Sequence, residues 1–125
     1  MERNAVHTPN APAAIGPYSQ AIRVGETVYV SGQIPIDPAT GAIPEGIAAQ
    51  TAQSLKNIQA ILAEQGMTLA DVVKTTVFLA DMNDFAEMNK VYGEYFAQPF
   101  PARSAVQVAK LPKGAPLEIE CIAVK

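Results

Sequence analysis

One arginine near the C-terminal end of the chain could do chemistry on a small carboxylate. Arg103 lies in the stretch FPARSAV, just after a proline and beside small residues, with no acidic residue near it in sequence. Its planar guanidinium could hold a carboxylate by two parallel hydrogen bonds. It could also form an ordinary salt bridge with a glutamate of the chain, and the pattern leaves both interpretations open.

Two glutamates alternate in the last apolar run, Leu117–Val124, which is expected to be a strand. On a strand, Glu118 and Glu120 share one face with Ile122 and Val124, so the carboxylates lie on a face that becomes apolar two residues later. Exposure at a strand end would explain them. The alternative is a half-buried carboxylate, whose pKa desolvation raises, and which could act as an acid or base near neutral pH.

Four further residues are candidates for a site, each with a simpler structural explanation. Ser31 and Gly32 interrupt the run VYVSGQI, where a glycine marks either a β-bulge or the close approach of a ligand or backbone. Strict alternation places Gly32 on the face of Val30 and opposite to Ser31. Tyr18 in the N-terminal arm suits packing as well as a pocket, and Asn89 suits a surface amide as well as a ligand contact.

Residue counts limit the other kinds of chemistry. The chain has one histidine, His7, and one cysteine, Cys121, so a zinc site of paired His or Cys ligands and an internal disulfide are both excluded. A Ser-His-Asp triad would require His7 to reach a pocket from the N-terminal arm. Acid–base chemistry must therefore come mainly from carboxylates, tyrosines or lysines.

The overall composition is that of a globular protein. The 125 residues suit a single domain over 1–125, and 49% are hydrophobic against 17% charged. A net charge of −3 argues against nucleic acid as a main partner. No apolar run approaches the roughly 20 residues that span a bilayer, and no signal peptide is evident. We therefore expect a soluble, cytoplasmic protein with no membrane partner.

Periodicity predicts which elements position these residues. Two β-rich runs flank Gly25-Glu26, a pair suited to a two-residue hairpin turn. Apolar residues recur at helical spacing from Ile47 to Leu62, before Gly66, and again from Phe85 to Phe96. Three more strands are expected within 71–81, over 103–109 and over 117–124, so the order is β-β-α-β-α-β-β.

This order favours an α+β sandwich in which two helices back one face of a single sheet. The strand within 71–81 is apolar on both faces, with Val72 and Phe78 opposite to Val73, Val77 and Leu79. The face that no helix covers would then expose an apolar patch, which monomers rarely tolerate. We expect the chain to associate with copies of itself through that face.

The strands 103–109 and 117–124 are joined by the turn LPKGAP. We expect them to pair as an antiparallel hairpin, because consecutive strands with a short connection usually do. Arg103 and Glu118 would then line one region of the sheet.

Together, four stretches of the chain resemble the Rid family, also called YjgF, and within it the RidA subgroup of enamine/imine deaminases. They are NAPAAIGPYSQA, VSGQIPIDPATG, VKTTVFLADMNDFAEMN and FPARSAVQVAKLPKGAPLEIECIAV, and the resemblance covers nearly the whole chain from Asn10. It implies a chorismate-mutase-like (YjgF-like) fold. It also implies a homotrimer whose sheets face a central barrel, with active sites in the clefts between subunits.

The resemblance further implies a cofactor-free hydrolysis of 2-imino acids, such as 2-iminobutanoate and 2-iminopropanoate, to 2-keto acids and ammonia. This reaction detoxifies by-products of pyridoxal-phosphate-dependent dehydratases. Arg103 matches the arginine that binds the substrate carboxylate, and Glu118 the glutamate that positions or activates water. The remaining matches fall on pocket positions, namely Tyr18, Ser31, Gly32, Asn89 and Ala105.

One position departs from the family pattern. Ala105 stands where relatives often carry cysteine, so only its backbone amide could contact a substrate. Two other functions stay open. The same cleft could bind 2-keto acids as a non-catalytic or regulatory trimer. An endoribonuclease or translation inhibitor is the third, and the acidic net charge and single histidine argue against it.

Overall fold

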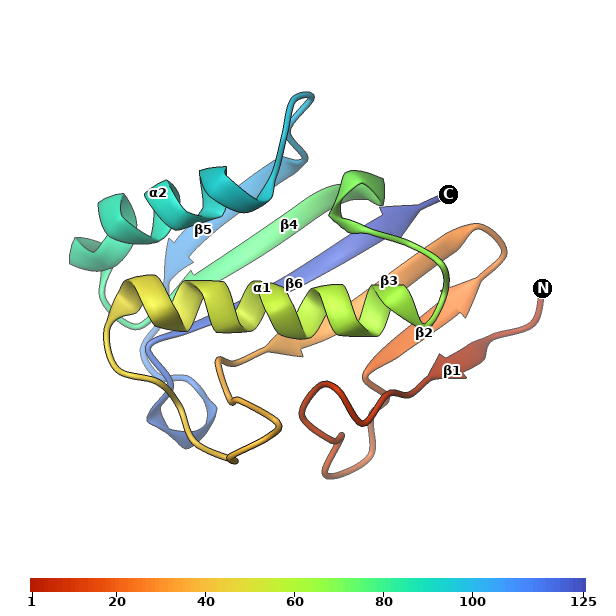
Figure 1. Cartoon of the computed structure of the whole chain (residues 1–125), viewed down its shortest axis with the longest axis horizontal. Coiled ribbons are helices and arrows are strands. Elements are labelled where there is room, and N and C mark those ends of the chain that lie inside the picture. The colour runs from red at the N-terminus through yellow and green to blue at the C-terminus, as the bar shows by residue number, and fades with distance from the viewer.

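A six-stranded mixed sheet carries two helices on one of its faces (Figure 1). The structure, a computed structural model, describes all of residues 1–125. The strands lie side by side in the order β1-β2-β3-β6-β4-β5. The elements along the chain are β1 (Asn4–Val6), β2 (Ala21–Val24), β3 (Thr27–Gln33), α1 (Ile47–Ala63), β4 (Val72–Leu79), α2 (Phe85–Tyr95), β5 (Ala102–Gln107) and β6 (Leu117–Val124).

The predicted α+β arrangement is confirmed, with one additional strand. β1 pairs antiparallel with β2 at the edge of the sheet, Asn4 opposite Arg23. Three residues carry too little alternation to be recognised as a strand in the sequence. The hairpin between β2 and β3 turns at Gly25, whose φ of 58° is in the left-handed region that favours glycine.

The core lies between the sheet and the helices. The apolar stripe of α1 supplies Leu55, Ile58 and Leu62, and β4 supplies Val77 and Leu79; all five are fully buried. Burying each such side chain stabilises the fold by roughly 1.5–3 kcal/mol relative to leaving it in water. The sheet is thus held against the two helices by one continuous apolar layer.

Strict alternation fails at the start of β4. The register between β4 and β6 shifts between Val72 and Lys74, as a β-bulge does. Val72 therefore lies on the buried face with Val77 and Leu79, and Val73, 48% exposed, lies on the other face. Strict alternation predicts these two valines the other way round. Phe78 lies opposite to Val77, as predicted.

The predicted hairpin of β5 and β6 is wrong. β5 pairs in parallel with β4, with Arg103 beside Thr75, and β6 pairs antiparallel with the other edge of β4, with Glu118 beside Phe78. β4 thus lies between the two strands. A strand that is apolar on both faces is suited to this central place, because both of its edges are paired and one of its faces packs against the helices.

The face of the sheet that no helix covers exposes large apolar side chains. Tyr29, Val106 and Val124 are 50%, 43% and 40% exposed, and their register partners place them all opposite to the helices. The sequence predicts an apolar patch on this face, and the structure shows large apolar side chains exposed there.

Neither helix has the length and apolar character needed to cross a membrane.

Candidate active site

Arg103 lies on the face of the sheet that carries the helices, and α2 holds its side chain. An Nη1 hydrogen is donated to Oδ1 of Asn89 at 2.7 Å. The guanidinium carbon lies 4.7 Å from the ring centroid of Tyr92 and 5.4 Å from that of Phe85. These contacts are cation–π interactions and one amide hydrogen bond, so no carboxylate of the chain neutralises the arginine. The alternative of an internal salt bridge with Glu118 is wrong for the single chain.

Glu118 lies on the opposite, uncovered face. Its register partner Phe78 and its neighbour Glu120 point to the same side, whereas Leu117 and Ile119 point into the core. The carboxyl is half-buried. Of the two interpretations of this residue, solvent exposure and partial burial, the structure favours the second.

Partial burial changes the acidity of Glu118. Desolvation raises the pKa of its carboxyl above the usual value, and the negative charge of Glu120 raises that pKa further. No cation of the chain offsets these two effects. A carboxyl of this kind stays protonated to higher pH than an exposed glutamate, which suits proton transfer near neutrality.

Gly32 lies directly against Glu118. The register between β3 and β6 shifts between Val30 and Gln33, so the predicted alternation breaks and Gly32 faces Glu118, not the side of Val30. A β-carbon on Gly32 would lie 2.6 Å from both Cδ and Oε1 of Glu118, closer than such atoms approach. The glycine therefore marks a bulge and also provides the space that the Glu118 side chain occupies. The sequence leaves a bulge and a close approach to Gly32 as alternatives, and the structure shows both.

Replacing Gly32 by alanine is expected to displace the Glu118 carboxylate without unfolding the protein. The new methyl group would meet the end of a flexible side chain, which can move away at little cost in stability. If Glu118 takes part in a reaction, activity should fall by about tenfold or more, because small misplacements of a reacting group are costly. Thermal unfolding measured beside activity would separate the two effects. Unchanged activity with an unchanged melting temperature would contradict a role for the Glu118 position.

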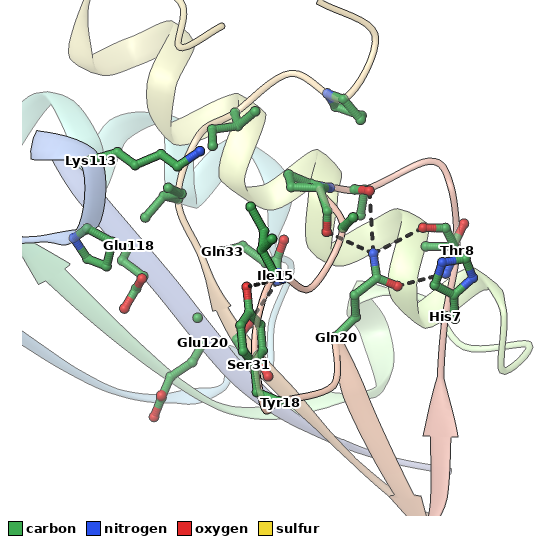
Figure 2. Close-up of a pocket in the computed structure, with 18 of the residues that line it drawn as sticks. His7, Thr8, Ile15, Tyr18, Gln20, Ser31, Gln33, Lys113, Glu118 and Glu120 are labelled. Atoms are coloured by element: carbon green, nitrogen blue, oxygen red, sulfur yellow. Dashed lines mark hydrogen bonds between the residues drawn. The ribbon is translucent and has the colours of Figure 1, made fainter. Parts of the chain in front are cut away.

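Tyr18 and Ser31 lie in the same pocket as Glu118 (Figure 2). The Ser31 hydroxyl donates to the Ser19 carbonyl at 2.6 Å, and the Tyr18 hydroxyl accepts from the Ile15 amide at 3.3 Å. Both side chains thus help to shape the N-terminal arm. Tyr18 is still 54% exposed, so it is available to a ligand.

A buried glutamine fixes this arm, and sequence reasoning missed it. Gln20 donates from Nε2 to the carbonyls of Thr8 and Pro12 at 3.0 and 2.9 Å, and its Oε1 accepts from the Thr8 amide at 2.7 Å. Figure 2 shows these bonds on the side of the pocket opposite to Glu118. The only sequence signal for this role is a polar residue, Gln20, directly before β2 and after a turn-rich arm.

All of the candidate residues except Ala105 fall into two separate cavities. We call the first, of about 1010 Å³, the glutamate pocket; it contains Tyr18, Ser31, Gly32, Glu118 and Glu120. We call the second, of about 380 Å³, the arginine pocket; it is lined by Asn89, Tyr92, Gly93, Phe100, Pro101 and Arg103. Within one chain the structure brings together the members of each set, but it does not bring the two sets together.

Ala105 lies in neither pocket lining. It pairs with Val77 in register, and its methyl group packs against the apolar core. The single cysteine does not supply a reactive thiol in its place, because burial raises the pKa of Cys121 to about 12 and keeps it protonated.

The fold and these pockets define a class of protein: a two-layer α+β protein with an arginine and a glutamate held on opposite faces of one sheet. The family described as Endoribonuclease L-PSP matches this chain over residues 8–125. The chain therefore belongs to that family, which is the Rid or YjgF family predicted from the sequence.

Individual relatives carry different names. A RutC family protein of Haemophilus influenzae is 54% identical to this chain over 129 residues, which are 100% of this chain and 99% of the relative. A 2-iminobutanoate/2-iminopropanoate deaminase of Salmonella typhimurium is 53% identical over 123 residues and 96% of each chain. The crystal structure of the YjgF gene product of Escherichia coli superposes with a TM-score of 0.93 at 51% identity, over 98% of each chain.

Proposed function

We propose that this protein hydrolyses reactive 2-imino acids, such as 2-iminobutanoate and 2-iminopropanoate, to 2-keto acids and ammonia. The observation that carries the proposal is a pair of complementary groups that the chain leaves unpaired. Arg103 is held by uncharged partners, and Glu118 has a raised pKa to which no cation of the chain contributes. A relative named for this deaminase activity, at 53% identity, gives further support.

The two groups are too far apart in one chain to act on one small molecule. Arg103 is level with Thr75 and Glu118 with Phe78, three residues further along β4. That is roughly 10 Å along the strand, and two strand spacings add roughly 10 Å across the sheet. The two side chains also point to opposite faces. We propose that Arg103 of one copy and Glu118 of a neighbour form each site in a homotrimer.

The uncovered face supports this assembly. It exposes Tyr29, Val106 and Val124, and it also carries Glu118. Burying such a face against other copies would remove apolar area from water and would bring each glutamate pocket to a subunit boundary.

The chemistry follows from these two groups. Arg103 holds the substrate carboxylate by two hydrogen bonds and so orients the adjacent C=N carbon. Water adds to that carbon while Glu118 accepts its proton, and a C–O bond forms as the C=N π bond breaks. The proton then passes from Glu118 to nitrogen, which gives a carbinolamine with an NH2 group. Glu118 next takes the proton of the carbinolamine hydroxyl and passes it to nitrogen, so that the C–N bond breaks, ammonia leaves and the ketone forms. Free 2-imino acids already hydrolyse in water, so positioning and one base are sufficient catalysis.

Mixing two inactive variants is expected to restore activity if each site is shared between chains. Arg103→Ala and Glu118→Gln chains, unfolded together and refolded as a mixture, would form some boundaries with an intact arginine from one chain and an intact glutamate from the other. Random assembly makes roughly a quarter of the boundaries intact in this way. Imine hydrolysis by the mixture, compared with each variant refolded alone, measures the effect.

A mixture as inactive as its components would show that both groups act within one chain or not at all. Wild-type protein refolded in the same way is the control for recovery of the assembly.

A coupled assay tests the activity itself. Threonine dehydratase acting on threonine generates 2-iminobutanoate, and its disappearance is followed with and without this protein. Faster loss is expected. A protein that binds 2-oxobutanoate but does not accelerate the loss would be a carboxylate receptor, the second candidate predicted from the sequence.

A further inference from the structure

Arg103 is held in its position entirely by groups that carry no charge. Asn89 accepts one hydrogen bond from Nη1 at 2.7 Å, and the ring of Tyr92 lies 4.7 Å from the guanidinium carbon. A carboxylate partner would also hold the arginine, but it would neutralise the charge that a ligand needs. An aromatic face attracts the cation and leaves its in-plane donors unused. The edge formed by Nε and Nη2 makes no hydrogen bond within the chain.

Tyr92 is itself held in place by a hydrogen bond to a buried threonine. Its hydroxyl lies 2.6 Å from Oγ1 of Thr75, and Thr75 is fully buried. Thr75 is also the residue that pairs with Arg103 across β4 and β5. Each of the three residues therefore contacts the other two. Thr75 and Arg103 are paired in the sheet, Thr75 and Tyr92 share a side-chain hydrogen bond, and Tyr92 and Arg103 make a cation–π contact.

Packing alone does not account for a tyrosine at this position. The ring of Tyr92 packs against that of Phe96, with centroids 4.6 Å apart and planes tilted by 37°, and phenylalanine would fill the same space. Burying a hydroxyl costs free energy unless it is hydrogen-bonded, so a purely structural position gains little from it. The hydroxyl does fix the ring in the plane over which Arg103 lies, at the wall of the arginine pocket.

We propose that Tyr92 is a positioning residue for substrate binding. It holds the Arg103 guanidinium so that the Nε and Nη2 edge faces the carboxylate of a 2-imino acid, and Thr75 holds Tyr92. This inference rests on the proposed function, since it assumes that Arg103 binds the substrate carboxylate.

Replacing Tyr92 by leucine is expected to raise KM for 2-iminobutanoate by about tenfold and to leave kcat within about twofold. Without the ring, the Arg103 side chain samples other rotamers, and it loses this conformational entropy when the substrate binds. Binding of 2-oxobutanoate, measured by calorimetry, should weaken by the same factor. Tyr92→Phe keeps the ring and should restore KM to within about threefold of the wild type, which loss of stability alone would not predict.

Phe96→Leu is the matched control. It removes the other ring of the same aromatic pair, and Phe96 makes no cation–π contact with Arg103, so the change should lower the melting temperature and leave KM unchanged. A second control combines Tyr92→Phe with Thr75→Val. Removing both hydroxyls leaves no buried group unpaired and should recover stability lost by Tyr92→Phe alone.

The outcomes separate this inference from the function on which it rests. If Arg103→Ala abolishes hydrolysis but folded Tyr92→Leu keeps the wild-type KM and 2-oxobutanoate affinity, Tyr92 does not position the arginine. If Arg103→Ala is itself fully active, the proposed function fails first. In the Arg103→Ala background, Tyr92→Leu should weaken 2-oxobutanoate binding no further. Should Tyr92→Leu not fold, Tyr92→Met fills the same volume and is judged by the same readouts.

Discussion

Arg103→Ala is expected to lower kcat/KM for 2-iminobutanoate by at least about 100-fold. The variant loses both hydrogen bonds to the substrate carboxylate, and charge-assisted bonds contribute about 1.5–3 kcal/mol each, where about 1.4 kcal/mol is tenfold. The fold should persist, because Arg103 is only partly buried and its partners Asn89 and Tyr92 are uncharged. Steady-state kinetics on freshly generated imine, beside thermal unfolding, would measure both effects.

Arg103→Lys is the matched control for this experiment. It keeps the positive charge but cannot form two parallel hydrogen bonds, so it should recover only part of the lost kcat/KM. Lysine as good as arginine would mean that charge alone binds the substrate. Wild-type turnover by the alanine variant would remove Arg103 from the mechanism altogether.

Glu118→Gln is expected to lower kcat by about 10²–10⁴-fold, the usual contribution of a general base. KM should change little, since the carboxylate of the substrate is held by Arg103. The wild-type kcat should rise with pH through the raised pKa of Glu118, because the ionised form accepts the proton. This limb should be absent in the variant. A change in KM alone would make Glu118 a binding residue.

The same raised pKa has a consequence for stability. In the unfolded chain Glu118 ionises at its ordinary pKa, whereas the folded state holds the proton to higher pH. Stability linked to this group is thus fully present below the unfolded pKa and is lost as pH rises through the folded pKa. Glu118→Gln should therefore melt at a higher temperature than the wild type at neutral pH, and this advantage should disappear in acid.

Glu120→Gln should lower the pKa seen in the pH profile of kcat, because the negative charge of Glu120 raises the pKa of Glu118.

Local patterns in the sequence were sufficient for most of the elements. The last strand was predicted over Leu117–Val124 and has those bounds, because strict alternation of core and non-core residues identifies a strand without knowledge of its neighbours. The stripe from Ile47 to Leu62 is likewise buried on one side of α1. Arg103 and Glu118 could be singled out because a lone cation and an acidic pair are unusual within β-rich runs.

Patterns failed where the backbone departs from regular geometry. One extra residue in a strand reverses the face of those beside it, so the bulge at Gly32 and the one at Val73 each overturned an assignment made by alternation. No single residue type signals such a bulge with certainty. Only the structure shows that the space left by Gly32 is filled by Glu118.

The sequence by itself determined the kinds of residue available, the order of the elements and the membership of the Rid family. The tertiary structure decided which strands are neighbours and which faces the functional groups occupy. Strand pairing is non-local: β4 inserts between β5 and β6 because a strand apolar on both faces packs best at the centre of the sheet. That insertion separates Arg103 from Glu118 by a strand, and their partners on β4, Thr75 and Phe78, lie on opposite faces of the sheet. The two placements together lead to the proposal of a site shared between subunits.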